Sequence, residues 1–180
     1  MYDPSATRPL GTTVRNQGPY RWGVPNRRPT SDLSVLFDLF AAGQRLKRLL
    51  AVAMEGSPLR PEEYAAYSVV FDRGPLTPTE MAGLLGMPVT TALDHVRLMS
   101  RRGHVTRRRH PEDGRSYLVS LTESGRRTHS EAGRAFDRAM LPLAQNLGID
   151  PVDVRRVLEA LGEAMDTTFE GLLEGQAEAG

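Results

Sequence analysis

Cysteine is absent from this 180-residue chain, and aromatic residues make up only 6% of it. The lack of cysteine excludes disulfide bonds, thiolate zinc sites and thiol-based redox sensing within the chain. No apolar run approaches the roughly 18 residues that a membrane-spanning helix needs, and the N-terminus lacks the apolar core of a secretory signal. We therefore expect a cytoplasmic protein that has no membrane partner.

Signatures of catalysis and of metal binding are missing as well. The sequence contains no Gly-rich phosphate loop, nucleophile elbow or zinc-binding signature, so we expect neither an enzyme nor a cofactor. None of the four histidines forms a closely spaced HxxxH-type pair, and we interpret them as surface or packing residues rather than metal ligands. They are His95, His104, His110 and His129.

Positive charge is concentrated in two parts of the chain, although the net formal charge is only +1. Residues 1–30 carry five Arg against one Asp, and residues 77–126 carry eight Arg against five acidic residues. Residues 127–180 are acidic instead, with five Arg against ten carboxylates. This distribution suits a protein that meets a polyanion with one part of its surface only.

Residues 1–30 have Pro or Gly every few positions and no helical or strand periodicity, which predicts a disordered basic arm. Its arginines, with Tyr20 and Trp22 among them, are suited to contacts with phosphates, and Arg-rich arms of other proteins enter the DNA minor groove. A solvated tail without specific contacts is the alternative, and we favour it.

Residues 77–125 contain the signals of two short helices followed by a hairpin. Thr77 and Glu80 match a capping box at the start of the first helix, and Gly86 is placed to end it in a left-handed turn. A second helix, which begins at Pro88, is predicted to run to about residue 103 because its apolar residues recur at helical spacing.

The pattern then changes from helical to alternating, which predicts strands over 104–109 and 116–121 joined by a turn over 110–115. A lone two-stranded ribbon is only marginally stable in water, so this hairpin must pack against the helices. Thr122 is placed to cap a long helix that ends near Leu147.

Amphipathic helices are predicted on both sides of this unit. Residues 31–57 and 61–73 each show apolar residues at three- and four-residue spacing, and Asp150 is placed to cap a last helix. The apolar stripe of that last helix is too long for a domain of this size to cover, so we predict that it forms a subunit interface with the first helix. Folding back onto the core is the alternative. The stripe residues are Leu33, Leu36, Phe37, Val152, Val154, Val157, Leu158, Leu161, Met165, Phe169 and Leu172.

The second helix and the hairpin carry side chains suited to DNA. The major groove admits one helix whose N-terminal residues meet base edges, which threonine can bond. Successive arginines on a strand point to alternate faces, and Asp113 is placed to orient Arg115 for a narrow minor groove. For Asp94 we favour pairing with Arg97 along the helix over contact with a cytosine. The candidate DNA-binding residues are Pro88, Thr90, Thr91, Asp94, Arg97, Arg107, Arg108, Arg109, Asp113 and Arg115.

The segment VTRRRHPEDGRSYLVSLTESG resembles the wing of the MarR family of transcriptional regulators, which has a D-x-R tip, alternating apolar residues and an L-T-x-x-G ending. The order of helices on both sides also fits, so that the resemblance covers about residues 31–175. It implies a mainly α-helical winged helix-turn-helix fold with a small β-hairpin wing and with dimerisation helices at both chain ends. The matching residues are Asp113, Arg115, Leu121, Thr122 and Gly125.

The resemblance further implies a homodimeric repressor that binds a pseudo-palindromic operator in double-stranded DNA and is released by a small aromatic or phenolic ligand. On this basis we divide the chain into a basic arm (1–30), a dimerisation region (31–57 and 123–176) and a winged helix-turn-helix domain (58–122).

The second helix departs from the family pattern in its first turns. The family commonly has Ser and then Arg early in this helix and another Arg near position 94, whereas this chain has Pro88, Val89 and Asp94. The base preference of other family members is therefore not assigned to this chain.

A ligand pocket is expected where the first two helices meet the long helix after the wing. Aromatic residues at helical spacing also suit an ordinary core, which is the alternative that we favour. Two other functions stay open. The protein could be a winged-helix dimer that binds another protein, or an architectural DNA-binding protein that responds to no ligand. The adjacent arginines of the wing favour nucleic acid over a protein partner. The candidate pocket residues are Arg48, Met54, Tyr64, Tyr67 and Phe71.

Overall fold

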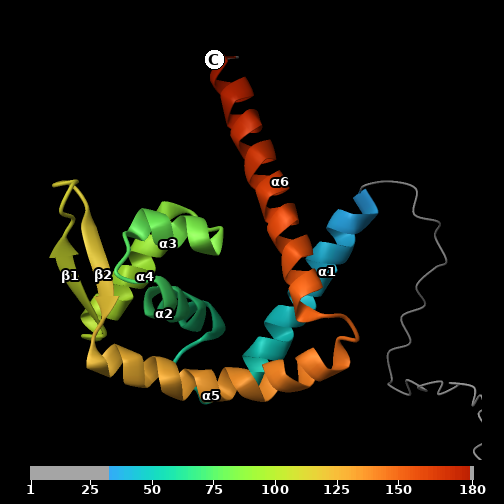
Figure 1. Cartoon of the computed structure of the whole chain (residues 1–180), viewed down its shortest axis with the longest axis horizontal. Helices are drawn as coiled ribbons and strands as arrows, with labels where there is room; N and C mark the ends of the chain where they lie inside the picture. The colour runs from blue at the N-terminus through green and yellow to red at the C-terminus, as the bar shows by residue number, and fades with distance from the viewer. Residues whose placement is uncertain (1–32, 179–180) are drawn as a thin grey trace, which may run out of the picture. The chain divides into compact units, whose positions relative to one another are not determined.

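The computed structural model describes residues 33–178, in which six helices and one two-stranded antiparallel sheet occur (Figure 1). The predicted basic arm, together with Ser31 and Asp32, lies outside the described residues. The chain divides into two units at Leu39, within the first helix, and the domain boundaries drawn from the sequence remain predictions. The elements are α1 (Leu33–Ala53), α2 (Pro61–Arg73), α3 (Pro78–Leu85), α4 (Val89–Arg101), β1 (Val105–Arg109), β2 (Tyr117–Leu121), α5 (Glu123–Asn146) and α6 (Pro151–Glu178).

The caps predicted for α3 are confirmed. The Thr77 hydroxyl accepts a hydrogen bond from the Glu80 backbone N–H at 3.1 Å, and the Glu80 carboxylate accepts one from the Thr77 N–H at 2.7 Å. Gly86 ends α3 in the left-handed region, with φ 59°. The next helix starts one residue later than predicted, because Pro88 has an extended ψ of 143° and serves as the N-cap of α4 rather than its first residue.

The hairpin of β1 and β2 is anchored to the helical part of the fold, as its predicted marginal stability requires. Its register places Val105 opposite Leu121 and Arg109 opposite Tyr117. On its other side, Val119 of β2 exchanges two backbone hydrogen bonds with Leu76, which precedes α3. This third short segment fixes the orientation of the hairpin, from here called the wing, relative to α3.

One apolar core holds α2, α3, α4, the wing and the first half of α5 together (Figure 1). The Thr122 hydroxyl caps α5 by accepting from the Gly125 N–H at 3.1 Å, as predicted. Because this core joins α4 and the wing directly, the two candidate DNA-reading elements form one packed body. Its largest fully buried side chains belong to Leu59, Tyr67, Met81, Val96, Met99 and Val119.

The terminal helices carry apolar side chains that this core leaves uncovered. On α6, Val157 and Phe169 are 66% and 62% exposed, and Leu36 and Phe37 at the start of α1 are exposed as well. Val154 and Leu161 are half-buried. None of the helices in residues 33–178 is long and apolar enough to cross a membrane.

Candidate nucleic-acid interface

Helix α4, the candidate DNA-reading helix, has one buried face and one exposed face. Ala92, Val96 and Met99 fix its inner face in the core. Its outer face carries five candidate residues, all exposed, which include both threonines of the first turn. The helix begins without an acidic residue or a side-chain cap, so its first N–H groups and its positive dipole end remain available to an anion. The exposed candidates are Pro88, Thr90, Thr91, Asp94 and Arg97.

The ion pair expected within α4 is present. Arg97 Nη1 donates to Asp94 Oδ1 at 2.7 Å, with both side chains largely exposed. An exposed pair of this kind contributes little to stability. Its effect is to hold the Arg97 guanidinium beside Asp94 while leaving other N–H groups of Arg97 free.

The three adjacent arginines of β1 do not share one face. Arg107 and Arg109 lie on the same side of the strand as buried Val105, whereas Arg108 lies on the opposite side. The Arg107 guanidinium stacks over the Tyr117 ring at 5.0 Å from its centroid, a cation–π contact that limits its freedom. All three side chains remain exposed.

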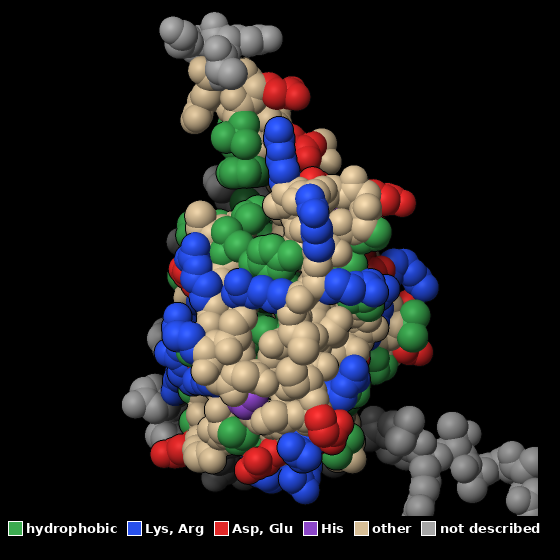
Figure 2. Space-filling view, turned by 90° about the vertical axis from the view of Figure 1, so that its left-hand side faces the viewer, with side chains coloured by type: hydrophobic (Ala, Val, Ile, Leu, Met, Phe, Trp, Pro, Cys, Tyr) green, Lys and Arg blue, Asp and Glu red, His purple; other side chains and the backbone are tan. Residues whose placement is uncertain are grey.

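At the tip of the wing, Asp113 contacts the backbone of Arg115. Its carboxylate Oδ1 accepts from the Arg115 N–H at 3.0 Å, while no bond joins Asp113 to the Arg115 guanidinium among the described contacts. Asp113 therefore fixes the chain direction at Arg115 and leaves the charged group of Arg115 exposed. Figure 2 looks onto the side of the molecule that carries the wing, where Lys and Arg side chains form a band across the middle of the face.

Comparison with known proteins agrees with this arrangement, although no protein-family model matches the chain. An HTH-type transcriptional regulator of Mycobacterium bovis is 31% identical over 105 residues, which cover 58% of this chain and 73% of the relative. Among solved structures, a MarR-family regulator from Rhodococcus superposes with a TM-score of 0.60 at 21% identity, covering 74% of this chain and 94% of that one. This chain belongs to the MarR family of transcriptional regulators.

A second solved structure shows the same fold in the presence of DNA. The regulator MosR of Mycobacterium tuberculosis, solved in complex with DNA, superposes with a TM-score of 0.63 at 23% identity. The match covers 74% of this chain and 96% of MosR. At such identities the likeness establishes the winged helix-turn-helix fold and no residue role.

This MarR-family protein also has a buried carboxylate on α2, which was not among the site residues predicted from the sequence. Glu63, in the first turn of α2, is only 3% exposed. It accepts hydrogen bonds from the Arg60 N–H at 3.0 Å and from Arg102 Nη2 at 3.2 Å. Burial raises the pKa of Glu63, but the Arg60 N–H and the Arg102 charge together bring it below its usual value. Glu63 thus ties α2 to the C-terminal end of α4.

A second polar contact ties α2 to the start of the wing. The Tyr67 hydroxyl and His104 Nδ1 form a hydrogen bond of 2.8 Å. Burial raises the pKa of Tyr67 and lowers that of His104, so both groups are held neutral. The Thr122 hydroxyl donates to the Gly103 carbonyl at 2.9 Å, which closes the base of the wing against α5.

The five pocket candidates do not form one site. Met54 and Tyr67 are buried in the core, and Arg48 is exposed on α1. Only Tyr64 and Phe71 come together, because both rings stack on His129 of α5, with centroids at 5.1 and 4.6 Å. These two aromatic rings are therefore packed against α5, and a ligand-binding role for the five residues stays a prediction.

His129 is held between α2 and α5 by a polar contact as well as by stacking. The Ser68 hydroxyl lies 3.0 Å from His129 Nε2, and burial lowers the pKa of His129. An open groove of about 420 Å³ lies elsewhere, between α1 and α5, and its lining includes none of the five candidates. The groove is lined by Leu49, Val52, Ala53, Glu55, Arg138 and Ala139.

Proposed function

We propose that this protein is a homodimeric repressor that reads a pseudo-palindromic operator with α4 in the major groove and the wing in the minor groove. One observation carries the proposal: the free N-terminal face of α4 and the arginine-bearing wing belong to one packed core. Phosphate contacts by side chains and a helix N-terminus position a protein on DNA, whereas base edges provide specificity. The DNA-bound MosR structure, which has the same fold, supports this assignment.

Within this interface the wing supplies the minor-groove contact. Arg115 stands at the tip with its guanidinium exposed and its backbone fixed by Asp113. Narrow minor grooves have enhanced negative potential that attracts arginine. Arg107, Arg108 and Arg109 then lie along the strand that leads to the tip, where they are suited to phosphates.

The dimer is proposed from the uncovered apolar residues of α1 and α6. Contiguous apolar surface beyond a few hundred Å² is uncommon on soluble monomers and marks interaction sites. In this proposal a second copy of the chain covers the exposed apolar residues of each helix. Two reading units, each made of α2, α3, α4 and the wing, then face two half-sites spaced about one helical turn apart.

Release by a small aromatic or phenolic ligand is the regulatory part of the proposal. Support comes from the open groove between α1 and α5, in which Arg138 and Glu55 accompany an apolar lining. A ligand there would contact α5, the helix that also packs on α2 of the reading unit. Loss of operator binding upon addition of phenols or aromatic acids tests this part.

The central experiment uses operator fragments selected from genomic DNA by the full chain. Arg115→Ala should weaken operator binding at least about tenfold at fixed salt and make the salt dependence of log affinity shallower by about one unit. Arg134→Ala on α5 removes the same charge outside the proposed interface and serves as the matched control. Equal affinities of Arg115→Ala and wild type would exclude the wing contact.

A further inference from the structure

The turn of the wing is organised around a histidine side chain that accepts hydrogen bonds from the backbone. His110 Nδ1 lies 3.2 Å from the Glu112 N and 3.0 Å from the Asp113 N, and both N–H groups donate to it. A nitrogen that accepts these bonds carries no proton, so in this arrangement the ring hydrogen lies on Nε2. Pro111 has no N–H, and Glu112 is therefore the first residue of the turn that needs an acceptor.

The other backbone groups of the turn bond within the same small unit. The His110 N–H donates to the Ser116 carbonyl at 3.1 Å, and the Ser116 N–H donates to the Asp113 carbonyl at 3.0 Å. The Arg115 N–H donates to the Asp113 carboxylate. In the turn, these backbone N–H groups have no opposite strand to bond. The side chains of His110 and Asp113 accept their hydrogen bonds instead.

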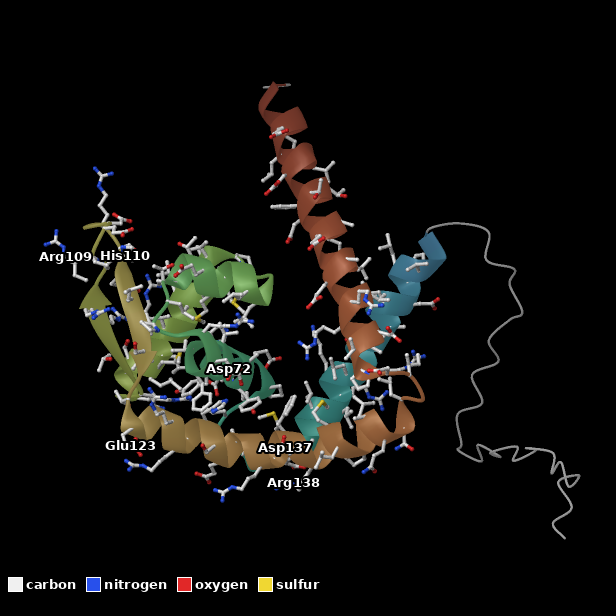
Figure 3. All side chains as sticks on the ribbon, viewed as in Figure 1. Asp72, Arg109, His110, Glu123, Asp137 and Arg138 are labelled. Atoms are coloured by element: carbon white, nitrogen blue, oxygen red, sulfur yellow. The ribbon has the colours of Figure 1, made fainter. Side chains whose placement is uncertain are left out.

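Both arginines next to the turn depend on its shape. Arg115 follows Asp113 by two residues and takes its direction from the bonded backbone. The Arg109 guanidinium lies against Gly114, where an added Cβ would come within 2.7 Å of Arg109 Nη2. Figure 3 shows Arg109 and His110 together near the end of the wing that carries the turn.

We propose that His110 is a positioning residue for DNA binding: its imidazole, as a hydrogen-bond acceptor, fixes the turn that presents Arg115 to the minor groove. The proposal rests on the proposed function, in which Arg115 contacts DNA. The hydrogen bonds of His110 preorganise the wing tip for binding. A tip that is already ordered loses less conformational entropy on binding DNA than a flexible tip does. His110 itself need not touch the nucleic acid.

Three substitutions of His110 distinguish the effect of its hydrogen-bond acceptor from the effect of its ring volume. In His110→Asn the amide oxygen reaches the position of Nδ1, whereas in His110→Gln the oxygen lies one carbon further out, and His110→Ala has no acceptor. At mildly alkaline pH, Asn should retain operator affinity within about twofold. Ala and Gln should weaken it about 5- to 30-fold, as expected from the loss of two backbone hydrogen bonds. Equal affinity of the Ala and Asn variants would overturn the proposal.

A double-substitution cycle shows whether His110 acts through Arg115. In the Arg115→Ala background, His110→Ala should cause at most about a twofold further loss, since the group that it positions has been removed. An equal loss in both backgrounds would overturn the proposal. If Arg115→Ala alone has no effect, the wing contact of the proposed function fails instead. If Arg115→Ala weakens binding and His110→Ala does not, only the role of His110 fails.

The tautomer provides a readout that needs no substitution. At mildly alkaline pH, correlation of ring nitrogens with ring carbon-bound protons in ¹⁵N-labelled full-length protein should show the ring proton of His110 on Nε2. A proton on Nδ1 at mildly alkaline pH would overturn the proposal, because that nitrogen would then have no lone pair for the Glu112 and Asp113 N–H groups. Thermal unfolding of the three variants should differ little from that of wild type, since His110 lies outside the apolar core, beside the exposed residues 111–115.

Discussion

At the scale of single residues, close backbone approach explains a glycine that the sequence marked only by family resemblance. Gly125, in the first turn of α5, is buried, and a Cβ added there would overlap the backbone oxygen of His104. The L-T-x-x-G ending of the wing therefore has a steric cause. Local pattern could not reveal it, because the obstructing atom lies 21 positions earlier in the chain.

Substitution of this glycine should lower stability. Gly125→Ala is expected to reduce the free energy of unfolding by about 1–3 kcal/mol, the usual cost of forcing extra volume into a packed site. Gly83→Ala in α3, where an added Cβ meets nothing within 4 Å, should instead be neutral or stabilising by up to about 1 kcal/mol. Urea denaturation with an unchanged m-value measures both. Equal effects at the two sites would contradict the steric explanation.

His129 gives a residue-scale prediction for pH. Because burial lowers its pKa below the ordinary 6.5, the unfolded chain binds this proton more readily than the folded chain. Its effect on stability is therefore absent above about pH 6.5 and grows as a destabilisation as pH falls below it. The denaturation midpoint of wild type should fall between pH 6.5 and about 5 more steeply than that of His129→Gln. Parallel profiles of the two proteins would show that the buried imidazole is not responsible.

At the scale of elements, the sequence predicted the features that neighbouring residues determine, namely helix ends and strands. The caps at Thr77, Gly86 and Thr122 located three helix ends, and alternation located both strands of the wing. The start of α4 was misplaced by one residue, because proline fits the N-cap of a helix as well as its first position. The fold of the reading unit followed from these local signals and the family resemblance.

The polar contacts between elements could not be predicted in this way. Glu63 pairs with a residue 39 positions away, and Ser68 contacts His129 across 61 positions. Both residues belong to a regular amphipathic helix, in which an acid near the N-terminus and a mid-helix serine are ordinary features. Their partners are defined by the packing of α2 against α4 and α5, and no spacing in the sequence specifies that packing.

The Glu63 contact allows a prediction at this scale. Glu63→Ala should lower the free energy of unfolding by about 1–3 kcal/mol, less than for a fully buried ion pair because Arg102 is one-third exposed and can rehydrate. Asp153→Ala, which breaks the exposed pair with Arg156 on α6, should cost no more than about 0.5 kcal/mol. A double-mutant cycle with Arg102→Ala then measures the coupling between α2 and α4, and additive losses would exclude a direct interaction.

At the scale of the whole molecule, charge and apolar surface are divided between different parts of the chain. The segment of α4 and the wing is basic, whereas residues 127–180, which form most of α5 and α6, carry ten carboxylates against five arginines. This asymmetry lets a polyanion approach the wing while the acidic helices repel it. The composition predicted the division, because counting charges by segment needs no knowledge of packing.

The exposed apolar residues of α6 lead to the last prediction. If they form the interface with a second copy, the wild-type chain should sediment at twice its mass of 19.9 kDa. Leu158→Glu combined with Phe169→Glu places two charges in that surface and should yield a monomer. The monomer should bind a full operator far more weakly than wild type, because two reading units are no longer linked in one molecule. Its affinity for an isolated half-site should persist. Glu159→Gln on the same helix should leave the dimer intact, as should removal of residues 1–30. If the doubly substituted chain still sediments as a dimer, the interface lies elsewhere. If wild type is a monomer that binds its operator tightly, one reading unit is sufficient for binding.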